Sequence, residues 1–529
     1  MIHAIPNSDR SSCTPPRADY LIVALCFLGA VLLAYKLVLM INQGMFTYML
    51  DDPYIHLAVA EELAAHGHYG VNSIEACAPC SSPLWPFLMV PFAWLRHFEL
   101  APLLVNSMAG LATAMLALGR IRRLIPALPG DRTGLLLRVA VTLGFLLATN
   151  IIGLVFTGME HSLQVLLAVL VTEGMLRLAA GEKPGWWFDL AVIAGPWIRY
   201  ENMALTLVSV GMLFILGRRR QAMVLGLLAA AGLVAFSGYL VSLGLSPVPT
   251  SITAKSPFVG EVPIVAALRN LKFSFATGRG TLVALGVSLL TGIAMVWRGG
   301  GRWRLAALCL AVAGCLHLFA GAYGWVNRYE IYILAALVWG VGGIAGEMLK
   351  SVGCTPSRRL GWAMVPLLPT LGFPYLQGLA MLPLAANNIY EQQYQMHRFA
   401  VDFWRQPVAV NDLGYVSFQN PQYVLDLWGL ASPKALEARM KNEPPAWIAG
   451  LTARYDVKLA MVYASWFPKA PGGWRKIAVM RLSRKLITPA DGEVTFVATD
   501  PAFVPEIKDA LARFRQSLPP GLSIDGIDD

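Results

Sequence analysis

Two adjacent carboxylates, Asp51 and Asp52, are the residues of this sequence best suited to chemistry. They follow an apolar run that ends near residue 42, so we expect them at a membrane edge. A carboxylate there can take a proton from an acceptor hydroxyl if it stays ionised and within hydrogen-bonding reach. It can equally ligate a divalent cation, which prefers oxygen ligands. The simplest alternative is that both residues cap the next helix, with Pro53 in its first turn.

The composition is that of a polytopic membrane protein. Of 529 residues, 56% are hydrophobic and 14% are charged, with a mean hydropathy of +0.55, whereas soluble domains carry about 25% charged residues. Apolar runs close to the ~20 residues that cross a bilayer recur along the first three quarters of the chain. We expect about eleven transmembrane helices, at 20–42, 100–119, 135–153, 161–180, 187–198, 203–217, 222–244, 281–297, 304–321, 330–349 and 360–384. The fifth and sixth runs are too short to span alone and could form one bent pair.

The cations indicate on which side of the membrane each connection lies. Arg10 and Arg17 precede the first run, so the positive-inside tendency places residues 1–19 in the cytoplasm. The proposed inner connections are rich in cations, as at 120–123 and 218–220, whereas the longer outer connections hold few. The formal charge of +10 therefore records membrane orientation, and we expect no nucleic-acid partner.

The hydrophobic pattern of the chain changes at about residue 385. Residues 20–384 form the predicted transmembrane domain, with a first outer loop at 43–83. Beyond it, short apolar runs at 408–410, 422–427, 458–463 and 476–481 alternate with helical patterns near 432–441 and 503–516. This alternation predicts a small C-terminal α/β domain over residues 385–529. An odd number of spans would place it on the same side as the first loop.

The first outer loop carries a string that is similar to a known family. It reads DDPYIHLAVAEELAAHGHYGVN, followed by SSPLWP ahead of the next apolar run. This string resembles the first periplasmic loop of the C-type (GT-C) glycosyltransferase superfamily, and within it bacterial relatives of the mycobacterial terminal β-arabinofuranosyltransferase. The matching residues are Asp51, Asp52, Tyr54, Ile55, Gly67, Gly70, Asn72, Ser82, Pro83, Leu84 and Trp85. Weaker matches are FTGMEHSL (156–163), WIRYEN (197–202) and VNRYEIY (326–332), the second with Tyr200 where the family has proline.

The resemblance implies an inverting glycosyltransferase of the bacterial inner membrane with its active site facing the periplasm. The donor would be a polyprenyl-phosphate sugar, such as a pentofuranose, and the acceptor a glycan, lipid or protein. Asp51 or Asp52 would deprotonate the acceptor hydroxyl, with Asp51 slightly favoured as the first acid after the helix. Arginine forks match phosphate oxygens. The implied donor-phosphate or substrate-binding set is Arg199, Arg328, Lys255, Glu160, Tyr54 and Glu201.

Other interpretations of these residues stay open from sequence. Arginines at span ends also serve as interfacial anchors, and Glu160 could interact with a helix N-terminus. The chain could instead be a transporter or flippase for a lipid-linked saccharide, although transporters concentrate polar residues near the bilayer midplane. A third alternative is a non-catalytic subunit of an envelope complex.

Cofactors and cysteines give fewer indications. No cofactor is implied with certainty, and a divalent cation could bind at the acidic doublet. Cys77 and Cys80, close to His66 and His68, could form a zinc set. Because the loop faces an oxidising compartment, we expect a disulfide between the two cysteines instead.

Overall fold

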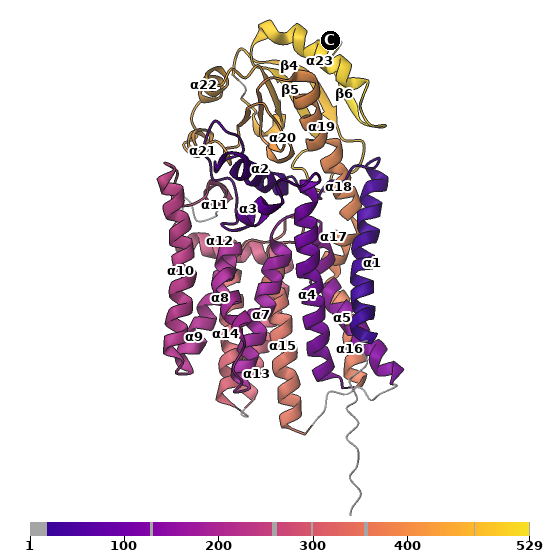
Figure 1. The fold of residues 1–529 in the computed structure, drawn as a ribbon, viewed down its shortest axis with the longest axis vertical. Helices are drawn as coiled ribbons and strands as arrows, with labels where there is room; N and C mark the ends of the chain where they lie inside the picture. The colour runs from indigo at the N-terminus through magenta and orange to yellow at the C-terminus, as the bar shows by residue number, and fades with distance from the viewer. Residues whose placement is uncertain are drawn as a thin grey trace, which may run out of the picture.

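The computed structural model has a helical bundle with a small sheet domain at one end, which we call the upper end (Figure 1). The structure describes residues 18–126, 131–255, 262–297, 300–353, 358–469 and 471–527. The bundle helices are α1 (Ala18–Ile41), α4 (Ala101–Leu124), α5 (Arg132–Ala148), α6 (Ile151–Val155), α7 (His161–Ala179), α8 (Trp186–Ile198), α9 (Met203–Ile215), α10 (Arg219–Ser242), α12 (Pro263–Ala276), α13 (Arg279–Val296), α14 (Gly301–Ala320), α15 (Ile331–Ser351), α16 (Arg358–Leu371), α17 (Phe373–Ala380) and α18 (Leu382–Glu391).

The bundle confirms that the chain is a helical protein of the polytopic membrane type. Seven helices of the described residues are long and apolar enough to cross a membrane: α1, the segment Phe98–Leu124, α7, α10, α13, α14 and α15. The remaining predicted runs are helical as well, but α5, α8, α9 and α16 have 17 residues or fewer. The total of about eleven spans therefore stays a prediction.

Helices α8 and α9 are too short to reach the upper end of the bundle. Each has 13 residues, or about 20 Å, whereas α10 has 24 residues, or about 36 Å. Because α9 and α10 are joined by a short turn at the lower end, the turn between α8 and α9 lies below the upper end of α10. The first loop enters the resulting depression, where the Leu84 N–H donates to the Trp197 carbonyl at 3.0 Å.

The sheet domain contains a six-stranded mixed sheet with the strand order β2-β1-β3-β5-β4-β6. The strands are β1 (Val408–Val410), β2 (Val424–Asp426), β3 (Leu459–Val462), β4 (Arg475–Arg481), β5 (Glu493–Ala498) and β6 (Ser523–Asp525). Strand β1 runs parallel to both neighbours, and the other pairings are antiparallel. The helices of the domain are α19 (Gln393–Arg398), α20 (Gly414–Ser417), α21 (Pro433–Met440), α22 (Ala446–Arg454) and α23 (Val504–Arg515). Strands β1 to β4 and helices α21 and α23 lie where the sequence pattern predicts them.

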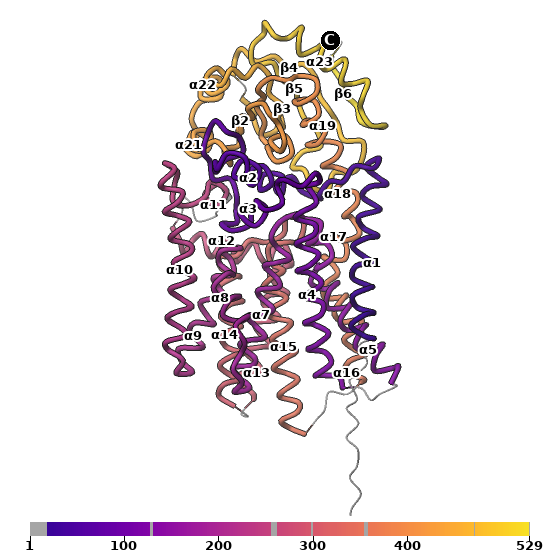
Figure 2. Tube along the Cα trace, in the orientation of Figure 1, coloured from indigo at the N-terminus to yellow at the C-terminus, as the bar shows by residue number. Residues whose placement is uncertain are grey.

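The first loop lies between the bundle and the sheet domain, as its indigo trace shows in Figure 2. It contains α2 (Asp52–His66) and the short α3 (Trp85–Met89). The Tyr54 ring packs 4.0 Å from the Tyr415 ring, and the Tyr423 hydroxyl donates to Glu75 at 2.9 Å. These contacts bind the loop to the sheet domain, so that both lie at one end of the bundle.

We expect single cysteines to report this arrangement in a variant that lacks the seven native cysteines. Cysteines at the exposed positions Ile74 and Gly473 should react with a membrane-impermeant maleimide from the same side, since both lie at the upper end. A cysteine at Gly301, where a new side chain meets nothing within 4 Å, should react from the other side. Labelling of the cysteines at positions 473 and 301 from the same side of the membrane would contradict the fold.

Candidate active site

A buried ion pair joins the acidic doublet to the loop before α15. The Arg328 guanidinium donates from Nη2 to Asp52 Oδ2 at 2.5 Å and to the Tyr329 hydroxyl at 3.0 Å. The Arg328 side chain is 1% exposed, whereas that of Asp52 is 20% exposed. A buried positive charge favours the ionised form of a neighbouring carboxylate. Asp52 is therefore held as a carboxylate that is partly open to solvent.

Arg328 is placed by a strained turn. Gly324, Trp325, Val326 and Asn327 have consecutive positive φ angles, with +61° at the β-branched Val326. Backbone strain of this kind costs about 1–3 kcal/mol per residue and persists only where surrounding contacts hold it. Asn327 provides such contacts, because its amide donates to the Pro374 carbonyl at 3.0 Å and its side-chain oxygen accepts from Arg279. The turn thus aims Arg328 toward α2.

Arg199, in the turn between α8 and α9, has a protein partner on each of its guanidinium nitrogens. Its Nε and Nη2 bind Glu201 at 3.1 and 2.6 Å, and its Nη1 binds Glu160 and Ser81 at 2.9 Å each. Burial alone would raise the pKa of Glu201, but the Arg199 charge outweighs it and the pKa lies below its ordinary value. Arg199 therefore connects the first loop to α7 and to its own turn.

Several polar atoms at the centre of this cluster are buried without a partner in the described residues. They are Nε and Nη1 of Arg328, Oε2 of Glu160, both ring nitrogens of His161 and the hydroxyl of Ser162. The Tyr329 ring lies beneath both guanidiniums, 4.9 Å from Arg328 and 5.6 Å from Arg199, and 5.9 Å from the His161 ring. An unsatisfied buried polar group costs about 1–3 kcal/mol, and more when charged. A polar or anionic ligand at this position would remove that cost.

Asp51 has a different environment from its neighbour. Its carboxylate accepts the backbone N–H groups of Gly414 and Tyr415 at 2.6 and 2.7 Å, and the residue is 7% exposed. Gly414 is required here, since a Cβ would lie 2.6 Å from the Asp51 carboxyl carbon. Asp51 therefore attaches the sheet domain to the bundle.

Asp412, on the sheet domain, completes the acidic cluster. It follows β1, and Tyr463 follows the parallel neighbour β3, so their side chains meet at the carboxyl ends of the two strands. The Tyr463 hydroxyl and the Gln393 amide donate to Asp412 at 2.9 and 2.7 Å. Asp412 also lies within hydrogen-bonding reach of Asp51. Burial raises the pKa of Asp51 well above its ordinary value, and the charge of Asp412 raises it further. The Asp51 carboxyl is therefore harder to ionise than an isolated aspartate.

The structure thus brings together most of the site residues suggested by sequence. Asp51, Asp52, Glu160, Arg199, Glu201 and Arg328 belong to one connected cluster at the upper end. Tyr54 lies beside it, fully buried, with its hydroxyl accepting from the Tyr48 N–H at 3.1 Å. Lys255 ends helix α11 (Thr250–Lys255), and its side chain lies outside the described residues.

Sequence reasoning missed the contributions of Asp412, Tyr463, Gln393 and His161. Asp412 stands at the end of a predicted strand, a position that turn formation explains equally well. The strand order of the sheet, which brings β1 beside β3, cannot be predicted from the sequence. His161 directly follows Glu160 in the FTGMEHSL segment, and that adjacency was an available signal.

The cysteine prediction was wrong. Cys77 and Cys80 are both free thiols, buried in the apolar cluster between the first loop and the sheet domain. Burial raises the pKa of Cys77 to about 12, which leaves its thiol unreactive. Within the described residues no group of three or more His, Cys, Asp or Glu side chains could hold a metal ion. The divalent cation at the doublet stays a prediction.

Comparisons with known proteins find one matching family model and several similar solved structures. Residues 387–497 match the profile of a domain of unknown function, DUF8728. The structure is similar to the cryo-EM structure of the arabinofuranosyltransferase AftD from Mycobacteria, with a TM-score of 0.41 and 15% sequence identity, over 92% of this chain and 42% of that chain. This chain therefore spans less than half the length of that protein. No curated protein sequence matches.

The carboxyl pair predicts how stability depends on pH. An acid whose pKa is raised by folding stabilises the folded state at low pH, and this contribution is lost as the pH rises through the raised value. Asp412→Asn removes the neighbouring charge that raises the pKa of Asp51. We therefore expect a smaller loss of thermal stability between about pH 4 and pH 8 than in the wild type. The measurement is the unfolding midpoint of the detergent-solubilised protein, with the exposed Asp509→Asn as control. Equal losses in all three proteins would contradict the effect of Asp412 on the pKa of Asp51.

Proposed function

We propose that this protein is an inverting membrane glycosyltransferase that moves a sugar from a polyprenyl-phosphate donor to an envelope glycan, lipid or protein. One observation carries the proposal: the Asp52 carboxyl contacts a buried guanidinium, Arg328, that keeps two nitrogens without a partner in the described residues. A candidate general base and an anion-binding cation thus adjoin each other at one end of an apolar bundle. The resemblance of the first loop to C-type glycosyltransferases supports the same reaction.

Arg328 is suited to hold the donor phosphate. Its Nε and Nη1, which have no partner in the described residues, can each donate a hydrogen bond to an anionic oxygen. Its Nη2 remains on Asp52, so phosphate and base are bound by a single side chain. Arg199, whose three guanidinium nitrogens each bind a protein side chain, is a positioning residue in this proposal. His161 and Ser162 can donate to the same phosphate or to sugar hydroxyls, because neither has a side-chain partner in the described residues.

Asp52 is the general base of the proposed reaction, in place of Asp51, which the sequence slightly favoured. A base must be ionised and within reach of the acceptor, whereas burial and the Asp412 charge raise the pKa of Asp51, and its carboxyl already accepts two backbone N–H groups. Asp52 takes the proton of the acceptor hydroxyl as that oxygen forms a bond to the anomeric carbon. The bond from this carbon to the phosphate oxygen breaks, and the polyprenyl phosphate leaves with the electron pair. Arg328 stabilises the charge that develops on the phosphate.

A transporter would place its polar residues differently. Transport sites lie near the bilayer midplane, commonly between interrupted helices. Here Asp52, Arg328, Glu160 and Arg199 gather where the first loop, which contacts the sheet domain, meets the bundle. This position favours transfer at the membrane surface, and we propose the periplasmic side on the strength of the cation distribution.

Replacing each of the two aspartates by asparagine should affect sugar transfer and stability differently. We expect Asp52→Asn to lower sugar transfer by at least about 100-fold, since a positioned general base contributes about 10²–10⁴-fold. Asp51→Asn should cost about 1–3 kcal/mol of stability through its backbone contacts and reduce transfer per folded molecule much less. The assay is mass spectrometry of envelope glycans and glycoproteins from a deletion strain that expresses each variant, normalised to membrane-inserted protein. An active Asp52→Asn protein would refute the assignment.

Substitutions of the two arginines should also have different effects on donor binding and stability. Arg328→Gln should raise the KM for the donor about tenfold to hundredfold, because a charge-assisted hydrogen bond to phosphate is lost. Arg199→Gln leaves Glu160 and Glu201 buried without their cation, so we expect about 3–5 kcal/mol of destabilisation with a smaller change in KM for the remaining folded enzyme. Product formation against the concentration of polyprenyl-phosphoryl arabinose, together with thermal unfolding, measures both effects. An unchanged KM in Arg328→Gln would remove the phosphate role.

A further inference from the structure

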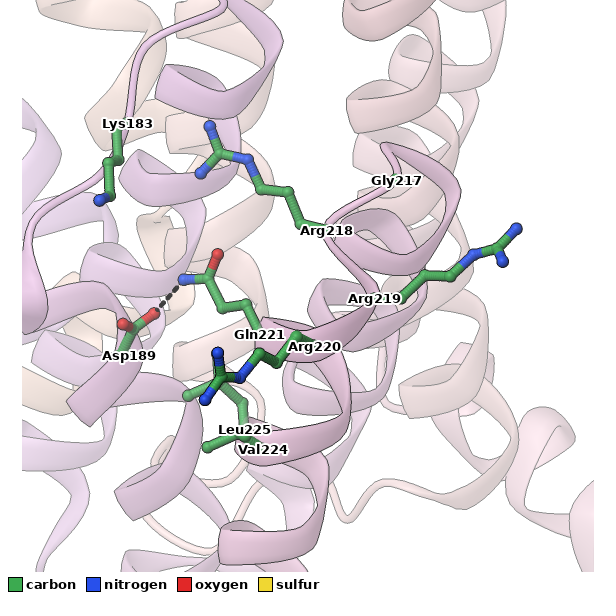
Figure 3. A pocket seen from close by; sticks show the side chains of 9 residues that line it. All are labelled: Lys183, Asp189, Gly217, Arg218, Arg219, Arg220, Gln221, Val224 and Leu225. Carbon is green, nitrogen blue, oxygen red and sulfur yellow. Dashed lines mark hydrogen bonds between the residues drawn. The ribbon is translucent and has the colours of Figure 1, made fainter.

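A basic recess of about 520 Å³ lies at the lower end of the bundle, remote from the candidate active site (Figure 3). Its lining comes from the connection between α7 and α8, from α8, and from the start of α10. The polar residues are Lys183, Asp189, Arg218, Arg219, Arg220 and Gln221, and Val224 and Leu225 close its apolar side. Figure 3 shows that the Arg218 side chain extends over the recess whereas Arg219 points away from it.

The cations of the recess lack acidic partners, unlike many others at the same end. In the described residues no carboxylate lies within ion-pair distance of Lys183, Arg218 or Arg220. The only acid that lines the recess there, Asp189, accepts a hydrogen bond from Gln221 at 2.7 Å. Several other cations at the lower end are neutralised. Arg122 and Arg138 bind Asp19, Arg123 and Arg177 bind Glu173, and Arg358 binds Asp131. The cations of the recess thus keep their charge for a ligand.

The recess borders surface that faces lipid. Trp186, at the start of α8, is 76% exposed, and Ile215, at the end of α9, is 67% exposed. Tryptophan is enriched at the membrane interface, so this end of α8 lies at headgroup level. Val224 and Leu227 continue the apolar surface along α10. A ligand with a charged head and apolar chains fits this boundary, with the head among the cations and the chains along α9 and α10.

We propose that this recess binds the phosphate group of an anionic phospholipid of the leaflet at the lower end. Arg218, Arg220 and Lys183 supply the donors, and the hydrogen bond between Asp189 and Gln221 holds α8 against α10 beneath them. Basic pockets between transmembrane helices on the cytoplasmic side are suited to such headgroups. The site is independent of the proposed transferase reaction, because its residues and the Arg328 cluster lie at opposite ends of the bundle.

Native mass spectrometry of the purified full-length protein, titrated with phosphatidylglycerol or phosphatidylcholine, tests the proposal. We expect clear preference for phosphatidylglycerol. The double variant Arg218→Gln, Arg220→Gln should bind it about 25-fold more weakly, at about fivefold for each cation removed, with unchanged binding of phosphatidylcholine. Arg359→Gln, an exposed cation at the same end outside the recess, should bind as the wild type does.

A variant that keeps the positive charges distinguishes loss of lipid binding from loss of folding. Arg218→Lys with Arg220→Lys should keep most of the preference, and thermal unfolding of all variants should coincide. Wild-type affinity for phosphatidylglycerol in the double glutamine variant would overturn the site. Displacement of phosphatidylglycerol by millimolar inorganic phosphate would likewise overturn it, since the recess would then recognise free phosphate without the lipid.

Discussion

The contact between Arg328 and Asp52 is the interaction on which the candidate site depends. It joins the first loop to the turn before α15 across 276 positions of the sequence. Burying a guanidinium is expensive unless it is paired with a negative charge. Among the carboxylates of the described residues, only Asp52 pairs with Arg328, and it contacts a single nitrogen, Nη2. The ion pair thus favours the ionised carboxylate and leaves Nε and Nη1 of the guanidinium without a partner in the described residues. Both properties are what transfer from a phosphate donor requires.

The remaining architecture brings these two groups together and keeps them beneath the sheet domain. The short helices α8 and α9 leave room for the first loop, and Arg199 fastens that loop through Ser81. Asp51 attaches the sheet domain by accepting two of its backbone N–H groups. Adjacent residues of one doublet consequently serve different purposes: Asp51 holds the two parts of the protein together, and Asp52 faces the space beside Arg328.

Sequence reasoning found the parts of the site that local pattern encodes. The membrane character, four of the strands and the gathering of Asp52, Glu160, Arg199 and Arg328 at one end follow from hydropathy, alternation and charge. The separate roles of the arginines could not be foreseen, since they depend on which carboxylates lie within 3 Å in the fold. The pairing of Asp51 with Asp412 depends on the strand order of the sheet, which is a long-range property. The expected disulfide was wrong because compartment and spacing alone do not determine whether two cysteines bond.

The most direct test of the ion pair as a catalytic unit is a structure of the protein with a polyprenyl-phosphonate sugar analogue, whose carbon–phosphorus bond cannot be cleaved. We expect a phosphonate oxygen on Nε or on Nη1 of Arg328. The Asp52 carboxylate should then lie on the face of the anomeric carbon opposite the phosphonate, where the acceptor oxygen attacks. A phosphonate bound away from Arg328, with Nε and Nη1 still without a ligand, would contradict the proposed role of the pair.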